Sequence, residues 1–370
     1  MLCLRPDELK QGMIIARPIY NKQGVLLYDR NTKLTRQSVQ SIKNFGLLAV
    51  FILEPTEPVP DITDEERMFE RFQTMAMFAL KDELDGLSNG KGLKNIENLA
   101  AKIIKMYGGL EHKMNFIGSL RSAEDYVYKH SLNVAIISAV IAHHMKMKHT
   151  EQMDVVIAAL LHETGKAMLP KSIIAKKEDD LTEEDKFMIK KYEIDGNELI
   201  QQDNNISASV KAIINQNFKE LAGKSGSNPR FLEGTRVLRI ADVFDTMTEV
   251  GVNHETFSKV AVIKYFLSEL DFYGEKGVGA LIKGINILNP GVCVELTNGV
   301  RALVIKENEE NLLRPILLDL DNNVVYDLNR DDLYNKVQIK DVLKTMDKRV
   351  KLSDDFVNRF LESINNRKQD

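Results

Sequence analysis

The 370-residue sequence contains no tryptophan and only two cysteines, Cys3 and Cys293. Two cysteines so far apart do not have the spacing of a metal site, and a low cysteine content is typical of a reducing compartment. No apolar run approaches the roughly 20 residues that a membrane-spanning helix needs. The first residues lack a basic stretch followed by an apolar run, so we expect no signal peptide. We therefore expect a soluble, cytoplasmic protein without membrane insertion.

The sequence also lacks an excess of positive charge. Its 50 lysines and arginines against 54 acids give a net charge of −4, and the isoelectric point is about 6.1. A polymeric nucleic acid partner needs a basic footprint, so the composition speaks against one. Hydrophobic content of 44% and charged content of 28% are ordinary for a globular protein.

Apolar periodicity predicts a mainly helical chain with a small sheet near each end. Alternating residues near both ends indicate short strands, and long stretches between them repeat with a helical period. The expected organisation is a small N-terminal α/β unit (1–54), a linker (55–63), a helical connector (64–122), a helical domain (123–285), a small antiparallel β unit (286–331) and C-terminal helices (332–370).

Individual residues mark where several elements should begin and end. A turn at Asn21–Gly24 should join two strands, and Thr35 and Thr182 are suitable N-caps for the helices that follow them. Gly165 is expected to end the helix that contains His162, as a C-cap glycine does.

Four side chains are candidate metal ligands: His130, His162, Glu163 and Asp242. Imidazole and carboxylate suit Fe, Mn, Zn or Mg, and such a metal polarises phosphoryl oxygens. Lys166 follows His162 by one helical turn and could place its ammonium group on a bound phosphate. Simpler interpretations remain open: a core histidine satisfied by its neighbours, a histidine at a helix C-terminus, and a solvated lysine.

The helix that contains Asp242 carries two further pairs of charged residues, and each pair has more than one possible role. Asp245 lies three residues after Asp242, so it could support a metal ligand or pair with Arg239. Arg236 and Arg239 lie one turn apart and could meet a phosphate, although a solvated face is the simpler interpretation.

The strings around these residues resemble the HD superfamily of metal-dependent phosphohydrolases. YKHSLNVA contains His130, ALLHETGK contains His162 and Glu163, and RIADVFD contains Asp242. The match is to the HD-GYP branch, bacterial phosphodiesterases that hydrolyse cyclic di-GMP at a site with two or three metals. The resemblance covers most of the chain, is densest over 123–250, and implies an HD-type helical bundle with signalling function.

The sequence departs from that family at positions that carry its metal ligands. Glu replaces the family's Asp after the second histidine, three further family histidines are absent, and the Asp-Gly-x-Gly-Tyr-Pro string has no counterpart in ELAGKSGSNPR. The residues found at the changed ligand positions are Glu163, Tyr192, Gln216, Asn217 and Phe218. Only seven histidines exist in the chain, and none stands at a missing position.

These departures predict a site for one metal at most. Phenol and amide groups are poor substitutes for imidazole on a transition metal, so the second and third metals lose their nitrogen donors. The tetrad of His130, His162, Glu163 and Asp242 remains. Glu163 is one methylene longer than aspartate, and a shift of about 1 Å can cost an active site ~100-fold in rate.

The sequence therefore suggests a degenerate HD-GYP-like protein whose cyclic di-GMP hydrolysis is lost or much weakened. It would bind a cyclic dinucleotide or a protein partner, with one divalent metal (Fe, Mn, Zn or Mg) or with none. One alternative is a one-metal phosphohydrolase in which Lys166 contacts phosphate. Another is a scaffold without a small-molecule site, a homodimer formed through 64–122 and 332–370. Whether the chain is an enzyme stays open, and the missing donors favour that it is not.

Overall fold

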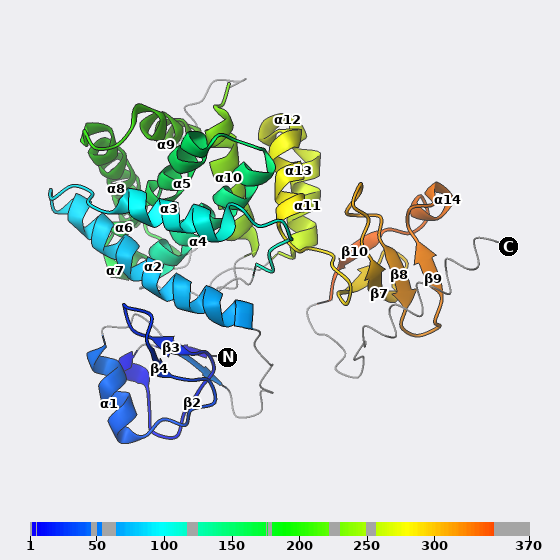
Figure 1. The fold of residues 1–370 in the computed structure, drawn as a ribbon, viewed down its shortest axis with the longest axis horizontal. Coiled ribbons are helices and arrows are strands. Elements are labelled where there is room, and N and C mark those ends of the chain that lie inside the picture. The colour runs from blue at the N-terminus through cyan, green and yellow to red at the C-terminus, as the bar shows by residue number, and fades with distance from the viewer. Residues whose placement is uncertain are drawn as a thin grey trace. The chain divides into compact units, whose positions relative to one another are not determined.

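The computed structural model describes residues 2–4, 6–45, 50–53, 64–116, 125–174, 176, 180–221, 230–248 and 257–343. The chain divides into two compact units. The first comprises 1–113, 117–256 and 270–284, and the second comprises 114–116, 257–269 and 285–370. The predicted linker at 55–63 lies outside the described residues. The structure is mainly helical with a small sheet near each end, as predicted (Figure 1).

The N-terminal part of the first unit contains short strands and one helix around a small apolar core. Strands β1 (Leu2–Leu4), β5 (Val50–Leu53) and β2 (Ile14–Ile15) form an antiparallel sheet in that order. Strands β3 (Ile19–Tyr20) and β4 (Leu26–Tyr28) form a separate hairpin. The 3-10 helix η1 (Pro6–Glu8) and helix α1 (Arg36–Asn44) complete this part.

Both local predictions for the N-terminal part are confirmed. Gly24 closes the turn that begins at Asn21, with a φ of +76° and its N–H donating to the Asn21 carbonyl oxygen at 2.9 Å. Thr35 caps α1 in a reciprocal arrangement with Ser38.

The helical part of the first unit is built around α4 (Tyr126–His144), which is buried along nearly its whole length. Because this helix is apolar on all sides, other helices must cover it. It packs against α5 (His149–Leu161), α10 (Glu233–Thr248) and α13 (Glu275–Gly284). The remaining helices are α2 (Asp64–Ser88), α3 (Ile96–Tyr107), α6 (Thr164–Ala167), α7 (Lys171–Ile174), α8 (Glu183–Gln202), α9 (Ala208–Leu221) and α12 (Leu270–Tyr273).

The prediction that Gly165 ends the His162 helix is wrong. Helix α5 already ends at Leu161 with His162 as its C-cap, and Gly165 lies inside the short helix α6. The reason for glycine there is close packing: a Cβ at position 165 would lie 2.4 Å from the Tyr192 carbonyl oxygen of α8. Gly196 of α8 faces Gly165 of α6. The two helices can approach this closely because both positions are glycine and carry no Cβ.

The second unit contains an antiparallel sheet with strand order β10-β6-β7-β8-β9. Its strands are β6 (Cys293–Leu296), β7 (Arg301–Lys306), β8 (Ile316–Asp319), β9 (Val325–Asp327) and β10 (Ile339–Val342). Residues with positive φ lie in its turns: Gly299 has a φ of +83° between β6 and β7, and Asn323 a φ of +56° between β8 and β9. Helix α11 (Lys259–Ser268) belongs to this unit, and the domain boundaries proposed from the sequence remain predictions.

The helix predicted over 332–370 is wrong where the structure describes it. Residues Asp331–Tyr334 form the short helix α14, but Ile339–Val342 form strand β10, which pairs with β6. Lys264 of α11 donates hydrogen bonds to the carbonyl oxygens of Ile339 and Lys340 at 2.6 and 3.0 Å. These tertiary contacts outweigh the helical tendency of the charged sequence. Residues 344–370 lie outside the described part.

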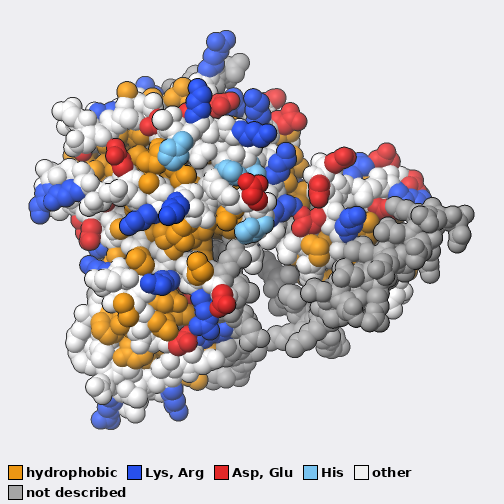
Figure 2. Space-filling model, viewed as in Figure 1, with side chains coloured by type: hydrophobic (Ala, Val, Ile, Leu, Met, Phe, Trp, Pro, Cys, Tyr) orange, Lys and Arg blue, Asp and Glu red, His pale blue; other side chains and the backbone are white. Residues whose placement is uncertain are grey.

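Among the described residues, no helix is both long enough and apolar enough to span a bilayer. On the face seen in Figure 2, the coloured basic and acidic side chains are interspersed instead of gathered by sign.

Candidate metal centre

Three helices bring the four predicted ligands together. His130 lies in the first turns of α4, His162 and Glu163 follow the end of α5, and Asp242 lies on α10. These three helices pack against one another in all pairings. The packing of the buried helix α4 therefore places residues that are about 30 and 110 positions apart at one site.

The ligand atoms converge on one point. The Nε2 atoms of His130 and His162 lie 3.3 Å apart, and the Glu163 Oε1 atom lies 3.8 Å from His162 Nε2. Among the described residues, His130, His162 and Glu163 form a cluster whose ligand atoms all lie within 4.8 Å of one another. Asp242 Oδ1 is 3.1 Å from His130 Nε2 and 3.9 Å from His162 Nε2. Two nitrogens and the Glu163 carboxylate thus form a compact cluster, and the Asp242 carboxylate lies next to its two histidines.

The outer nitrogen of each imidazole fixes which nitrogen is available to a metal. His130 Nδ1 lies 2.7 Å from Asp245 Oδ2, and His162 Nδ1 lies 2.7 Å from the Ala159 carbonyl oxygen. Ionised carboxylates and carbonyls only accept hydrogen bonds, so each Nδ1 carries a proton and Nε2 is the nitrogen that each ring turns toward the cluster. Such outer partners are typical of metal-bound histidines.

This donor set fits a divalent cation. Two imidazole lone pairs and the carboxylates of Glu163 and Asp242 repel one another at these distances unless a positive charge lies between them. Without a metal, that charge is a proton on His130. Burial lowers the pKa of His130, but hydrogen bonds to Asp242 and Asp245 outweigh this effect and raise it to about 9.

The pKa values of Asp242 and His162, the two neighbours of His130, are both lowered, but for different reasons. Burial raises the pKa of Asp242, but its hydrogen bond to His130 and the nearby cations hold it below its usual range. Burial lowers the pKa of His162, so this imidazole is neutral and ready to bind a metal. The metal-free site therefore holds one extra proton, on His130.

We expect metal binding at pH 7.5 to release about one proton per chain. His130 is protonated below pH 9 in the metal-free site, and a metal binds only the neutral imidazole. The apparent affinity should rise about tenfold per pH unit up to that pH. In the metal-free protein the raised pKa contributes stability below pH 6.5 that is lost as the pH rises through about 9. Calorimetry in buffers of different ionisation enthalpy measures the released proton, and a value of zero would contradict this assignment.

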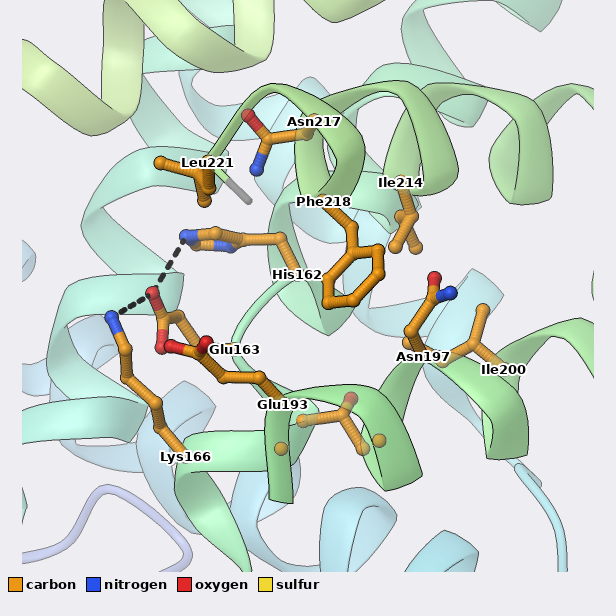
Figure 3. Close-up of a pocket in the computed structure, with 13 residues that line it drawn as sticks. His162, Glu163, Lys166, Glu193, Asn197, Ile200, Ile214, Asn217, Phe218 and Leu221 are labelled. Atoms are coloured by element: carbon orange, nitrogen blue, oxygen red, sulfur yellow. Dashed lines mark hydrogen bonds and ion pairs between the residues drawn. The ribbon is translucent and has the colours of Figure 1, made fainter. Parts of the chain in front are cut away.

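Lys166 is half-buried and pairs with a carboxylate of the cluster. Its Nζ donates to Glu163 Oε1 at 2.7 Å, the same oxygen that faces His162 (Figure 3). Burial lowers the Lys166 pKa, but the carboxylates of Glu163, Asp242 and Glu193 outweigh this and raise it. The structure therefore places a permanent positive charge beside the cluster.

A cavity of about 50 Å³ adjoins the cluster and extends toward α8 and α9. Polar groups from both helices line it: Glu193, Asn197 and Asn217, together with the apolar Phe218 and Leu221 (Figure 3). Burial and the nearby Glu163 raise the pKa of Glu193, although Lys166 opposes this. Sequence reasoning missed Glu193 and Asn197. The two residues are four positions apart and therefore share the face of α8 that carries Gly196. This spacing is the sequence feature that could have indicated them.

The residues at the family's missing histidine positions have other roles. Tyr192 is not among the residues that line the cavity, and its carbonyl oxygen instead lies against Gly165. Gln216 Oε1 accepts hydrogen bonds from the Leu232 N–H at 3.0 Å and from Thr235 Oγ1 at 2.8 Å. Gln216 thus satisfies the start of α10 and does not point at the cluster.

Asn217 and the two arginines of α10 are held by internal contacts. Asn217 is 2% exposed, and its Oδ1 accepts from Arg239 Nη1 at 3.2 Å. The Arg239 guanidinium lies over the Phe272 ring, 5.4 Å from its centroid. Arg236 Nη1 donates to the Phe272 carbonyl oxygen at 2.7 Å. Neither arginine belongs to a solvated face.

Comparisons with known proteins agree with this geometry. The family model described as "HD domain" matches residues 112–259. Cyclic di-GMP phosphodiesterase PA4108 of Pseudomonas aeruginosa is 20% identical over 200 residues, which are 53% of this chain and 48% of that protein. Cyclic di-GMP phosphodiesterase response regulator RpfG of Xanthomonas campestris is 26% identical over 155 residues, 40% of each chain. Cyclic di-GMP phosphodiesterase PdeB of Borreliella burgdorferi is 26% identical over 192 residues, half of each.

Residues 112–259 of the chain are thus similar to an HD domain. The matched HD domain contains all four candidate ligands and Lys166. The chain is similar to these cyclic di-GMP phosphodiesterases, and it matches between 40% and 50% of the length of those curated relatives. A solved structure, "Bd1817, a HDG"Y"P protein from Bdellovibrio bacteriovorus", aligns over 76% of this chain and 97% of that one, with 14% identity and a TM-score of 0.44.

Proposed function

We propose that this chain is a degenerate HD-GYP-like protein that binds one divalent metal and a cyclic dinucleotide, and that hydrolysis of the dinucleotide is lost or much weakened. One observation carries the proposal. Among the described residues that line the cavity, His162 is the only histidine, and the positions beyond it present Glu193, Asn197 and Asn217. A second transition metal would find no imidazole donor there.

The chemistry of a one-metal site differs from that of a two-metal site. A single bound metal supplies polarisation of a phosphoryl oxygen, whereas a metal pair also clamps the attacking and leaving oxygens of the displacement. The residues of this chain orient what the metal holds. Asp245 fixes the His130 ring, the Ala159 carbonyl fixes the His162 ring, and Lys166 neutralises part of the Glu163 charge.

The charges around the cavity make dinucleotide binding dependent on the metal. Asp242, Glu163 and Glu193 surround the site, and their carboxylates repel a phosphodiester unless a cation balances them. Lys166 supplies one positive charge, and the metal supplies two more. The proposal therefore requires that the metal-free protein bind the dinucleotide weakly.

We expect cyclic di-GMP to bind the metal-loaded protein at least tenfold more tightly than the metal-free protein. Replacing Lys166 by methionine should weaken binding by about tenfold, the value of one charge-assisted hydrogen bond. Lys186→Met is the matched control, because Lys186 lies on the exposed side of α8 and pairs with Glu183. Isothermal titration calorimetry measures each affinity. Equal binding with and without metal would contradict the proposal.

A one-metal phosphohydrolase is the second candidate. The observation in its favour is that His130 keeps its supporting carboxylate, Asp245, which is the arrangement that tunes a metal ligand. This candidate requires turnover of a phosphomonoester or phosphodiester with at least one of Mn, Fe, Mg or Zn. A screen of generic substrates that yields no product with any of these metals would exclude it.

A further inference from the structure

A row of hydrogen bonds, half-buried at Gln73 and buried beyond it, connects α2 to the candidate metal ligand His130. Gln73 on α2 donates from Nε2 to Asn133 Oδ1 at 2.9 Å, and Asn133 on α4 donates from Nδ2 to Asp245 Oδ1 at 3.0 Å. The other oxygen of Asp245 lies 2.7 Å from His130 Nδ1. Three helices thus contribute to one row that ends at the metal centre.

The direction of every bond in this row follows from the chemistry of Asp245. An ionised carboxylate only accepts, so Asn133 must turn its amide nitrogen toward Asp245 and its oxygen toward α2. That oxygen in turn needs a donor, which the Gln73 amide nitrogen supplies. Gln73 therefore fixes the orientation of Asn133, and Asn133 fixes the carboxylate that holds the His130 ring.

The inner residues of the row lie in the protein interior, where apolar side chains would give at least the same stability. Asn133 is fully buried, and Asp245 and His130 are 1% and 2% exposed. Replacing paired buried polar groups by apolar groups of the same shape is often neutral for stability or favourable. A role at the metal explains the polar choice better than a role in packing.

We infer that Asn133 and Gln73 are positioning residues for the metal-binding nitrogen of His130, and that α2 thereby sets the metal affinity of the site. The inference rests on metal binding in the proposed function. It adds two residues that touch neither metal nor dinucleotide. Asn133 holds Asp245 so that His130 Nε2 faces His162 and Asp242, and Gln73 keeps Asn133 from rotating its amide.

Asn133→Leu keeps the size of the side chain and removes both hydrogen bonds. We expect it to weaken metal binding by about 10- to 100-fold, as loss of an outer partner does in metalloproteins. Ser138→Ala is the matched control on α4, because the buried Ser138 hydroxyl has no hydrogen-bond partner among the described residues. The control should stay within about twofold of the unmodified chain, well below the effect of a lost outer partner.

Gln73 variants test the α2 end without opening the core around α4. Gln73→Met removes the donor and should weaken metal binding by a smaller factor than Asn133→Leu. Gln73→Glu keeps the shape but offers only acceptors, so it reverses the Asn133 amide against Asp245 and should weaken binding more than Gln73→Met. Thr74→Val is the control on α2, because among the described residues its hydroxyl donates within the helix, to the Glu70 carbonyl oxygen.

Competition with a chelator at fixed pH measures each metal affinity, and ¹⁵N NMR of the metal-free protein reports the His130 ring. The unmodified chain should show a hydrogen-bonded Nδ1–H signal that Asn133→Leu shifts or removes. A folded Asn133→Leu variant with unchanged affinity and ring signal would overturn the inference. Gln73→Glu affinity at or above that of the unmodified chain would overturn the α2 part. Failure of the unmodified chain to bind metal would instead contradict the proposed function.

Discussion

Replacing His162 by alanine should remove the metal from the purified protein, from about one equivalent per chain to less than a tenth. His162 contributes one of two imidazoles, and its Nε2 lies within 4 Å of His130, Glu163 and Asp242. Losing a central nitrogen leaves one imidazole and two carboxylates, a set with far lower affinity for a transition metal. Elemental mass spectrometry of protein purified without chelator gives the measurement.

His149→Ala provides the matched control for this experiment. His149 is an exposed histidine at the start of α5, the same helix that ends beside His162. The control should retain the metal content of the unmodified chain. Metal that persists undiminished in His162→Ala would place the binding site elsewhere and contradict the assigned ligand set.

Gly196→Ala is expected to destabilise the protein by about 3 kcal/mol, at the upper end of the overpacking range. An added Cβ would lie 2.4 Å from the Gly165 nitrogen and 2.5 Å from its Cα atom. Both are backbone atoms, so no side chain can rotate away, and α6 must separate from α8. Because α6 follows Glu163 and contains Lys166, the same change should also disturb the metal centre.

Gly279→Ala is the control for that substitution. Gly279 lies in helix α13, and nothing is within 4 Å of a Cβ added there. Alanine should therefore stabilise the helix by roughly 0.5–1 kcal/mol. Urea unfolding of both variants gives the comparison. A Gly196→Ala variant as stable as the unmodified chain would show that the α6–α8 contact is looser than described.

The four residues that the structure brings together could be predicted because their signal is local. His130, the His162-Glu163 pair and Asp242 each stand in a short recognisable string, and the helices that carry them have strong apolar periodicity. The spacing of Asp242 and Asp245 also suggested a ligand and its supporting carboxylate. In the structure, Asp245 Oδ2 lies 2.7 Å from His130 Nδ1, and its role in supporting a metal ligand stays a prediction.

Residues whose roles depend on contacts between distant segments could not be predicted in the same way. Gly165 looked like a helix end because glycine often ends helices, but its reason is the approach of Gly196 from α8. Glu193 reaches the cavity only because of how α8 is turned. Ile339–Val342 form a strand because β6 supplies the partner edge. None of these neighbours is visible in a local pattern.

The buried row from Gln73 to His130 shows the same limit. Gln73 lies 60 residues before Asn133, and Asn133 lies 112 residues before Asp245. A glutamine in an amphipathic helix is ordinarily a solvated residue, and nothing near it in the sequence indicates a buried partner. Only the packing of α2 and α10 on α4 brings the three residues together.

The turnover of cyclic di-GMP by protein saturated with Mn, Fe, Mg or Zn tests the central proposal most directly. Chromatography of the nucleotide after prolonged incubation separates the intact ligand from its linear product. We expect binding by the metal-loaded protein with little or no linear product, because the described cavity offers no imidazole beyond His162 for a second metal. Rapid conversion that depends on the metal and is lost in His162→Ala would contradict the proposal.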